Sequence, residues 1–589
     1  MRSVFSMVLL SFIFFGCTYM LEIVSTLSAK EIHHLMSQDT AIYLRLTGLK
    51  DVQKTFLNTP PITSLQQGLW YQQFLTSPEY ENIQKGVSFA NWLFETSSQN
   101  VFDNFFGQDV ALTLVPKKSE KGFFGLLICQ IQDPQKSLFY LDSFYRYILQ
   151  NQGILREKKT QFAGHPQEVF YFQNTKSPKK ETFILVLTDS FLFLANDENL
   201  IQYALQRLKE NPKESNSLFL QNPSVRDSLN KLPPHHFLTF YADFGQILKT
   251  YPQLFRDSTP EVPDKFQQLL EKQVVRSIRD IQTIGFSAQL TPAQCQFSTV
   301  VSFQNELQPL YVSSELSPLE NYLTNDVFGV LNIRALNQLL AFILEHPKIQ
   351  QILQKISVLF QGKNILQDIW PRLGEEVSLL LMKQPARLNT PNVPELPALH
   401  LVVSGRPPET VLQPIQQSLA TFLTAISLDP HNPGVLQYNQ YEGIPLFTFS
   451  HPDFAVWGEQ FLPCYAQLGD RLIFSSSYAS LKTLVSHYHQ KKTLPNTHPI
   501  YLALQPSEAN LQKMLAPLSR AGFVLYLPPV MDLLQRNQIY LLGEQQRNNP
   551  EIQAQWDFMY RILKTFQNLK FIQTQDKKYL GLTLTLEWK

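Results

Sequence analysis

The sequence predicts an α+β fold used twice, as two tandem, internally duplicated domains, each with a largely antiparallel sheet packed by amphipathic helices. Three observations predict it. The same short motifs occur in the same order in residues 36–304 and 323–589. Runs of strand-forming residues lie between amphipathic segments that begin with good capping residues. Both halves end on a pair of strand-like runs, which is typical of α+β domains.

Four pairs of motifs carry the internal repeat. Each half opens with a strand-like run that leads into a helix and continues with a strand that begins Gly-x-acid-Val. A Gly-x-Pro turn follows, and then a hairpin around an aspartate. The paired motifs begin at Asp39 and Asp326, at Phe106 and Leu373, at Phe162 and Tyr441, and at Leu187 and Leu468.

The duplication also divides the chain. Proline and serine interrupt the periodic pattern between Asn305 and Pro318, which is typical of a linker. A length of 589 residues fits two domains of roughly 250 residues each. We therefore expect a signal or anchor segment, a first domain, a linker and a second domain, at residues 1–30, 31–304, 305–318 and 319–589.

Strands are predicted where β-branched, aromatic and leucine residues cluster. In the last strand, Leu580, Leu582, Leu584 and Leu586 share one face, and threonines share the other. This alternation predicts an antiparallel sheet that is covered on one side. The main predicted strands are Gly125–Ile131, Thr182–Leu187, Phe237–Ala242, Ile284–Leu290, Phe297–Phe303, Ala398–Val403, Leu446–Phe449, Phe571–Thr574 and Leu580–Trp588.

Two predicted helices occupy the same place in the two halves. One follows Asp197 and the other follows Ser477, and both residues are good N-caps. Each helix comes directly after the hairpin that contains Asp189 or Asp470. Pro347 should kink or split a further helix. The other predicted helices are Tyr140–Gln150, Phe266–Ile281, Leu339–Phe360, Glu409–Ile426 and Glu551–Leu569.

The N-terminus is typical of an export signal or a membrane anchor. Arg2 precedes an uncharged apolar run from Val4 to Leu21. The sequence before Cys17 resembles a bacterial lipoprotein box, so Cys17 is a lipidation candidate. Phe14 departs from the leucine usual in that box, and the chain stays apolar after Cys17.

Those departures favour an uncleaved anchor over a lipoprotein, and cleavage after Ser25 or Ser28 is the third possibility. All three versions place the remaining chain outside the cytoplasm. We expect a protein of the cell envelope, anchored in a membrane or lipidated, with secretion as the alternative. The absence of any Asn-x-Ser/Thr acceptor favours a bacterial envelope.

Composition argues against a nucleic-acid partner. The chain has 50 basic and 49 acidic side chains and no long basic block, so it lacks the electrostatic surface that phosphates require. A hydrophobic content of 44% with 12% aromatic residues is sufficient for two large cores.

Motifs for catalysis, cofactors and metals are missing from the sequence. It has no His-Glu-x-x-His, no Cys-x-x-Cys, no Gly-x-Ser-x-Gly and no phosphate-binding glycine loop. We therefore expect no cofactor and no metal, and name no catalytic residue. Three further cysteines lie in apolar contexts that indicate buried small side chains rather than a disulfide framework: Cys129, Cys295 and Cys464.

Individual histidines give weak candidates. His235 and His236 are adjacent, and adjacent strand residues point to opposite faces, so a shared metal is disfavoured. His165 lies in the Gly-x-Pro turn, but the second half has Ile444 at that place. His400 lies in a strand with buried character, where a core histidine is the usual finding.

Acidic residues recur at two places in the halves. Asp109 matches Glu376, and Asp189 matches Asp470. Paired carboxylates could serve acid–base chemistry. Aspartate at a hairpin is also what turn geometry favours, because its side chain bonds nearby backbone. We interpret the shared acids as scaffolding.

The repeated elements together resemble a family of uncharacterised bacterial envelope proteins that carry a domain of unknown function. The resemblance rests on Tyr43-Leu-Arg-Leu, the Gly-Gln-Asp-Val and Gly-Glu-Glu-Val strands, the Gly-x-Pro turns and the hairpin from Gly469. It implies an N-terminal membrane segment, duplicated α+β domains and an extracytoplasmic location, and it supplies no site residues. We expect a non-catalytic protein that binds a protein partner or an apolar ligand. The alternative is an extracytoplasmic hydrolase whose site is scattered along the sequence.

Overall fold

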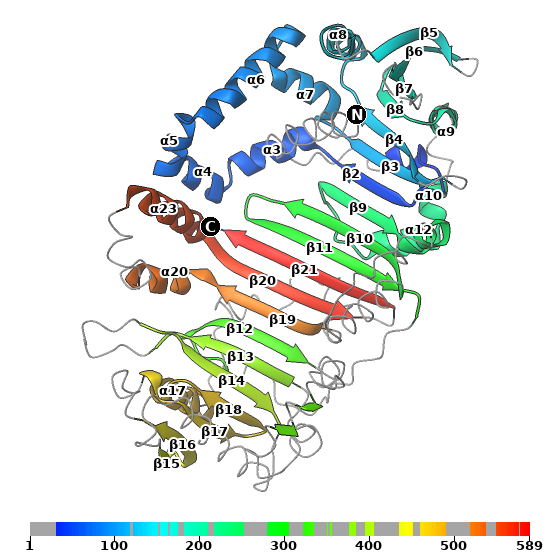
Figure 1. Ribbon diagram of the computed structural model, residues 1–589. Coiled ribbons are helices and arrows are strands. Elements are labelled where there is room, and N and C mark those ends of the chain that lie inside the picture. Colours follow the sequence, from blue (N-terminus) through cyan, green and yellow to red (C-terminus); the bar gives the residue numbers. More distant parts are fainter. Residues whose placement is uncertain are drawn as a thin grey trace.

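The computed structural model describes the larger part of both halves (Figure 1). The described residues are 31–117, 122–150, 154–162, 165–174, 182–209, 217–251, 280–305, 322–334, 350–351, 354–355, 376–384, 395–405, 435–451, 460–490, 519–537, 549–575 and 578–588.

The first half begins with a short helix and a strand, continues through five successive helices, and then alternates strands with helices. In order, its elements are α2 (Glu31–His34), β2 (Ile42–Leu46), α3 (Leu49–Leu57), α4 (Pro60–Gln66), α5 (Leu69–Leu75), α6 (Pro78–Phe94), α7 (Ser98–Phe106), β3 (Val110–Pro116), β4 (Phe123–Gln130), α8 (Pro134–Phe144), the π-helical turn η1 (Tyr145–Leu149), β5 (Ile154–Phe162), β6 (His165–Asn174), β7 (Thr182–Leu187), β8 (Phe191–Ala195), α9 (Glu198–Lys209), α10 (Leu218–Gln221), α11 (Pro223–Asn230), β9 (Leu238–Asp243), α12 (Phe244–Thr250), β10 (Ile281–Leu290) and β11 (Gln294–Phe303).

The second half repeats the order of the strands. Its elements are β12 (Val327–Arg334), β13 (Glu376–Met382), β14 (Ala398–Ser404), β15 (Val435–Tyr441), β16 (Ile444–Ser450), β17 (Cys464–Leu468), β18 (Arg471–Ser475), α17 (Tyr478–His489), β19 (Ser519–Tyr526), α20 (Leu527–Arg536), α23 (Pro550–Thr565), β20 (Phe566–Gln575) and β21 (Tyr579–Trp588).

The strands form a single antiparallel succession through both halves. The pairing order is β5, β6, β7, β8, β4, β3, β2, β9, β10, β11, then β21, β20, β19, β12, β13, β14, β18, β17, β16, β15. The two halves meet where β11 pairs with β21. Figure 1 shows this junction near the middle of the sheet.

Each strand from β2 to β11 corresponds to the strand whose label is higher by ten. The two strands of such a pair have corresponding neighbours in the sheet. For example, β4 lies between β3 and β8, and β14 lies between β13 and β18. The pairings therefore give both halves one strand order, and the two halves join through the corresponding strands β11 and β21. Duplication of whole domains, with Gly164 superposed near Gly443, stays a prediction. The residues Ala163 and Gly164 lie outside the described residues.

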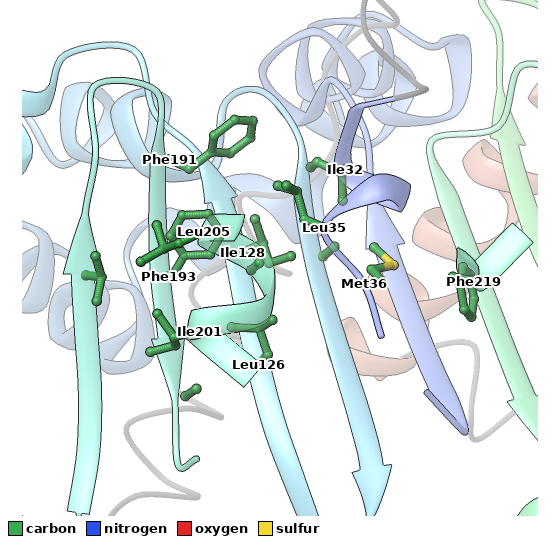
Figure 2. Close-up of a cluster of buried hydrophobic side chains, with 14 of the residues drawn as sticks. Ile32, Leu35, Met36, Leu126, Ile128, Phe191, Phe193, Ile201, Leu205 and Phe219 are labelled. Atoms are coloured by element: carbon green, nitrogen blue, oxygen red, sulfur yellow. The ribbon is translucent and has the colours of Figure 1, made fainter. Parts of the chain in front are cut away.

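Helices cover both faces of the sheet in the first half. On one face, α2 and α9 pack on β4 and β8 around Ile128, Phe193 and Ile201 (Figure 2). On the other face, α6, α7 and α8 cover β3, β4 and β8, with Phe105 and Tyr140 in the core. In the second half, α17 packs on β17 and β18 and forms the main core cluster.

Side chains also join the halves beside the β11–β21 pairing. Val52 of α3 packs in one cluster with Leu290 and Trp588. The indole of Trp588 donates to the carbonyl oxygen of Pro292 at 2.7 Å. On the same side, α4 contacts α23, where the Ser64 hydroxyl lies 3.4 Å from the carbonyl oxygen of Arg561 (Figure 1).

Local signals in the sequence explain the matching helices. The amide of Leu200 donates to Asp197 at 3.2 Å, and the amide of Ser480 donates to Ser477 at 3.2 Å, so both predicted N-caps are confirmed. In the hairpin from β15 to β16, Glu442 and Gly443 both have positive φ, at 48° and 77°. Two such residues give the mirror-image turn that matches the twist of a two-residue hairpin.

Three sequence expectations change. The helix expected from Tyr140 begins earlier, at Pro134, because Asp133 caps it. The helix expected to reach Leu569 ends at Thr565, because the next residues pair with β19 and β21 and strand pairing overrides the helical pattern. In β21 the expected contrast between a covered and an open face is weak, because Leu580, Leu582, Leu584 and Leu586 are only partly buried while Thr585 of the opposite face is buried.

Other expectations fall mainly or wholly on residues outside the described ranges. They are the segment 1–30 with Cys17, the linker 305–318, and the helices Phe266–Ile281, Leu339–Phe360 and Glu409–Ile426.

Candidate functional site

A buried carboxylate lies at the same place in each half. Asp109 directly precedes β3, and Glu376 is the first residue of the corresponding strand β13. Both side chains are buried. Removing a carboxylate from water is costly unless a cation or several donors replace the water. The partners of these two acids therefore show what the acids do.

In the first half the partner is Arg45 of β2. Its Nη2 donates to Oδ2 of Asp109, and both side chains are almost inaccessible to solvent. Burial lowers the pKa of Arg45, but the interactions with Tyr43 and Asp109 outweigh burial and raise it. Arg45 is therefore a cation that the protein holds in its interior by pairing it.

In the second half Glu376 has two donors. Its Oε2 accepts from Nη2 of Arg471 at 2.8 Å, and its Oε1 accepts from Nδ2 of Asn332 at 2.9 Å. The hydroxyl of Ser378 donates to Oδ1 of Asn332 at 3.0 Å, which fixes the orientation of that amide. The carboxylate is thus fully engaged inside the sheet.

The register shows how the two arrangements correspond. Asn332 lies opposite Ser378, two residues beyond Glu376, as Arg45 lies opposite Ala111, two residues beyond Asp109. Asn332 therefore occupies the place of Arg45. The positive charge comes instead from Arg471 of β18, a strand on the other side of β14.

Asp470 also takes part in this cluster. The hydroxyl of Tyr322 donates to Oδ1 of Asp470 at 2.9 Å, and the Arg471 guanidinium lies 5.2 Å from the centre of the Tyr322 ring. Burial, followed by the carboxylate of Asp470, raises the pKa of Tyr322. We expected Asp470 to bond its own turn, and the structure shows that it also accepts a hydrogen bond from a buried tyrosine. The turn itself depends on Gly469, whose φ is 58°.

Asp189 behaves differently from Asp470. It is exposed, and the turn around it is held by Thr188, whose Oγ1 accepts from the amide of Phe191 at 2.9 Å. The amide of Thr188 donates to the carbonyl oxygen of Phe191 at 2.9 Å, so the pairing of β7 with β8 leaves a two-residue turn at 189–190, as the pairing of Leu468 with Arg471 leaves one at 469–470. Asp189 is therefore the first residue of its turn, whereas Asp470 is the second residue of its turn.

His400 is a core residue, as its strand context predicted. Its Nε2 lies 2.9 Å from the hydroxyl of Ser480, and both residues are fully buried. Burial lowers the pKa of His400 to about 4, so the imidazole is neutral at pH 7. A serine beside a neutral histidine is a nucleophile–base pair in form. A substrate cannot reach this one.

Among the remaining histidine and cysteine candidates, burial and hydrogen bonding account for His236, Cys129 and Cys464. His236 Nδ1 lies 2.9 Å from the carbonyl oxygen of Pro233, and burial lowers its pKa. His165 is the first residue of β6. Burial raises the pKa of Cys129 and Cys464 to about 12, so both remain thiols.

Within the described ranges, no group of three or more His, Cys, Asp or Glu side chains is arranged to hold a metal. An open depression of about 290 Å³ is lined by polar residues and one leucine: Gln38, Asp39, Leu218, Gln221 and Asn222. It brings together neither a histidine with a carboxylate nor a pair of carboxylates. A hydrolytic site would need such groups close to one another and open to a substrate.

Large exposed aromatic side chains lie on α6, on α8 and on the turn η1 that follows α8. We call Phe89, Trp92, Phe139 and Tyr147 the α6–α8 aromatic surface. All four are exposed, and Trp92 keeps 60% of its accessible area. The rings of Trp92 and Tyr147 meet edge to face with centroids 5.3 Å apart, and those of Phe89 and Trp92 are 5.8 Å apart.

Sequence reasoning missed this surface, although a signal was present. Residues 89–94 place apolar side chains on both sides of α6, because Leu93 and Phe94 are buried while Phe89 and Trp92 are exposed. A surface helix normally shows one apolar stripe. A second stripe marks a surface that is available for contact.

The family comparison covers the centre of the chain. Residues 102–395 match the model described as "Protein of unknown function (DUF3352)". Residues 102–395, just under half of the chain, are therefore similar to this family. The expected resemblance to an uncharacterised family is confirmed to this extent. The match includes both buried carboxylates, Asp109 and Glu376, and crosses the linker expected at 305–318.

Other parts of the site lie outside the DUF3352 match. These are both arginine partners, Arg45 and Arg471, and the residues Phe89 and Trp92 of the aromatic surface. No curated protein matches the chain. Among solved structures, crystal form III of TP0453 matches at 10% identity and a TM-score of 0.24, over 48% of this chain and 84% of that chain. Crystal form I of TP0453 matches at 11% identity and a TM-score of 0.22, over 48% and 82%.

The N-terminal candidate, Cys17, lies outside the described residues. Among the helices that the structure describes, none has both the length and the apolar character needed to cross a bilayer.

Proposed function

We propose that this is a non-catalytic protein of the cell envelope, held at a membrane by its N-terminal segment, that binds a partner protein through the α6–α8 aromatic surface. The observation that carries the proposal is the group of exposed aromatic side chains on α6, α8 and η1, in which the ring of Trp92 contacts those of Phe89 and Tyr147. Tryptophan and tyrosine dominate the energetic centres of protein interfaces, because they bury a large area at little conformational cost.

The contacts among the rings support recognition of a folded partner. Trp92 lies between Phe89 and Tyr147, so its ring has a fixed neighbour on each side. Phe139 adjoins Tyr140, which is buried in the core beneath. Side chains that are ordered before binding lose less entropy on binding.

Charge around the surface favours a protein over a lipid bilayer. On α6, Lys85 is paired with Glu81 at 2.7 Å, and Glu79 lies in the same first turn. Surfaces that bind anionic lipids present clusters of unpaired lysine and arginine. Exposed rings also surround a small apolar ligand poorly, and such ligands need to be largely enclosed.

The hydrolase alternative has less support. One pair of the carboxylates that the two halves share, Asp109 and Glu376, is occupied by buried ion pairs with Arg45 and Arg471. The serine–histidine contact between Ser480 and His400 is closed to solvent. These groups maintain the sheet and have no access to a substrate.

The test is site-specific photocrosslinking in the cell of origin. The photoreactive residue p-benzoylphenylalanine is placed at Trp92, and as a control at Met559 of α23, whose exposed fraction is 43%. We expect one adduct of defined mass from position 92 and none from position 559. The substitutions Phe89→Ser and Tyr147→Ser should abolish that adduct in the cell. They should leave the unfolding temperature of the purified chain unchanged.

Three results would count against the proposal. Crosslinks to lipid alone would show that the aromatic surface rests on a membrane. Equal crosslinking from positions 92 and 559 would show that the surface selects no partner. Hydrolysis of peptide or ester substrates by the purified chain, abolished by Asp189→Ala or Asp470→Ala without a change in stability, would restore the hydrolase.

A further inference from the structure

The pairing order ends with β5 in the first half and with β15 in the second, and these strands hold corresponding places. Among the described residues, β15 pairs with β16 alone, through all seven of its residues. An edge strand leaves one row of backbone donors and acceptors for another strand. Natural proteins protect such edges with charged residues, proline or bulges.

The two edges differ in this protection. The strand β5 reads Ile-Leu-Arg-Glu-Lys-Lys-Thr-Gln-Phe, with four charged residues in succession, and its register shifts between Lys159 and Gln161. The strand β15 reads Val-Leu-Gln-Tyr-Asn-Gln-Tyr, with no charge, no proline and no shift in register. One chain thus supplies a protected edge and an unprotected edge at corresponding places.

Side chains fix β15 in an extended form ready for pairing. Asn439 donates to Thr448 Oγ1 of β16 at 3.1 Å, and the Tyr441 hydroxyl lies 3.0 Å from that of Ser486. The ring of Tyr438 meets Phe447 edge to face at 5.6 Å, and Phe447 stacks on Tyr465 at 4.7 Å. Tyr438 nevertheless remains 62% exposed, so its outer side is available.

We propose that β15 pairs antiparallel with β15 of a second copy of this chain, with Tyr438 at the two-fold axis. This register places Val435 opposite Tyr441, Leu436 opposite Gln440, and Gln437 opposite Asn439. The cross-strand pairs are then apolar with aromatic, apolar with amide, amide with amide and, at the two-fold axis, tyrosine with tyrosine. No like charges meet, which would destabilise a sheet.

A second copy fits this edge better than an unrelated strand for two reasons. First, an isologous contact brings together the two Tyr438 rings and extends the aromatic row of Tyr438, Phe447 and Tyr465 across the interface. Second, the chain already joins corresponding strands in this way, because β11 and β21 pair antiparallel over nine positions from Gln294 to Ser302. The dimer would extend the sheet by a further antiparallel pairing of corresponding strands.

The interface expected from one strand pair is small. Interfaces below about 1,200 Å² are typically weak or transient. The dimer should therefore depend on concentration.

The experiment measures the mass of the full chain in detergent by sedimentation velocity over a range of concentrations. We expect the wild-type chain to shift from monomer to dimer as its concentration rises. Tyr438→Lys and Tyr438→Glu each place like charges at the two-fold axis, so each should remain monomeric. An equimolar mixture of the two variants should form a dimer again, because opposite charges then meet. Leu69→Lys on α5, at the same exposed fraction of 62%, is the control and should dimerise like the wild type.

Intermolecular disulfide formation gives an independent readout. Tyr438→Cys should yield a covalent dimer on mild oxidation that neither the wild-type chain nor Leu69→Cys yields. A wild-type chain that stays monomeric at every concentration, or a charge-swapped mixture that stays monomeric although both variants unfold at the wild-type temperature, would overturn the proposal. Loss of the dimer is distinct from loss of the partner adduct at Trp92, since the two surfaces lie in different halves.

Discussion

At the scale of single residues, the arginine that neutralises the buried carboxylate comes from a different strand in each half. Arg45 precedes its acid in sequence and lies on β2, whereas Arg471 follows its acid and lies on β18. The carboxylate lies at the start of the corresponding strand in both halves, as Asp109 before β3 and as Glu376 in β13. This pattern is expected where burial requires a counter-charge but chemistry does not require a fixed geometry. It supports the interpretation of both acids as scaffolding.

The second-half ion pair provides a stability prediction. Glu376→Gln leaves the buried Arg471 without its carboxylate and should lower the free energy of unfolding by about 3–5 kcal/mol in urea denaturation. Combining it with Arg471→Met should recover most of that loss, because no isolated charge remains. Arg536→Met breaks the exposed pair with Glu395 and should cost less than about 1 kcal/mol. A loss for Glu376→Gln no larger than for Arg536→Met would refute the argument.

His400 should make stability depend on pH. Burial lowers its pKa to about 4, below the value near 6.5 expected in the unfolded chain. The unfolded chain therefore binds more protons between these values, so stability is retained above about pH 6.5 and falls by about 3 kcal/mol as pH drops to 4. Urea midpoints of the wild type and His400→Gln should diverge in slope across this window. Parallel slopes would show that His400 is not the group that titrates.

Asp470 and Asp189 form a matched pair of variants. Asp470→Ala removes one acceptor of the buried Tyr322 hydroxyl, which also lies 3.2 Å from the carbonyl oxygen of Leu468, and should cost about 1 kcal/mol. Asp189→Ala removes an exposed side chain and should change stability by less than about 0.5 kcal/mol. Thermal unfolding of the two purified variants measures the difference, and equal losses would contradict the assignment.

At the scale of elements, sequence predicted what depends on near neighbours in the chain. The helices after Asp197 and Ser477 follow from their caps, and the paired runs at the end of each half follow from period-two alternation. Of the successive helices between β2 and β3 only the first was predicted, because the apolar residues of the others serve contacts with α23 and with one another. Helix propensity and pattern do not reveal such contacts.

The candidate site was predicted less fully for the same reason. Asp109 and Glu376 were visible as matched positions, but their partners are 64 and 95 residues away. No local pattern connects residues so far apart in sequence. The aromatic surface was missed because Phe89 and Trp92 fit the spacing of an ordinary helix core.

The β15–β16 hairpin provides a prediction about a single element. Gly443 has a φ of 77°, which β-branched residues strongly disfavour. Gly443→Val should therefore lower the free energy of unfolding by about 1–2 kcal/mol, while Gly443→Asn should cost less, since asparagine tolerates this conformation. The two variants are compared by urea denaturation. A valine variant as stable as the asparagine variant would show that the turn can change its type freely.

At the scale of the whole molecule, the apolar run from Val4 to Leu21 predicts that residues 31–589 lie outside the cytoplasm. A fusion to Lys589 of a reporter that is active only outside the cytoplasm should be active. Cys17→Ser should abolish lipid labelling if the chain is a lipoprotein, and should leave membrane retention unchanged if the segment is an uncleaved anchor. Activity of a cytoplasm-only reporter at Lys589 would refute the localisation.

The pairing of β11 with β21 has a consequence for the order in which the chain can fold. The strand β11 is finished by residue 303, yet its outer neighbour is β21, the last strand, at 579–588. A chain that emerges from a ribosome or a translocation channel with its N-terminus first must therefore hold β11 uncovered until nearly all of the second half has followed. The folding nucleus of the first half can assemble early, but assembly of the two halves waits for the final strand. A nascent chain that stalls before β21 keeps an open, ten-residue strand edge, which is a template for aggregation.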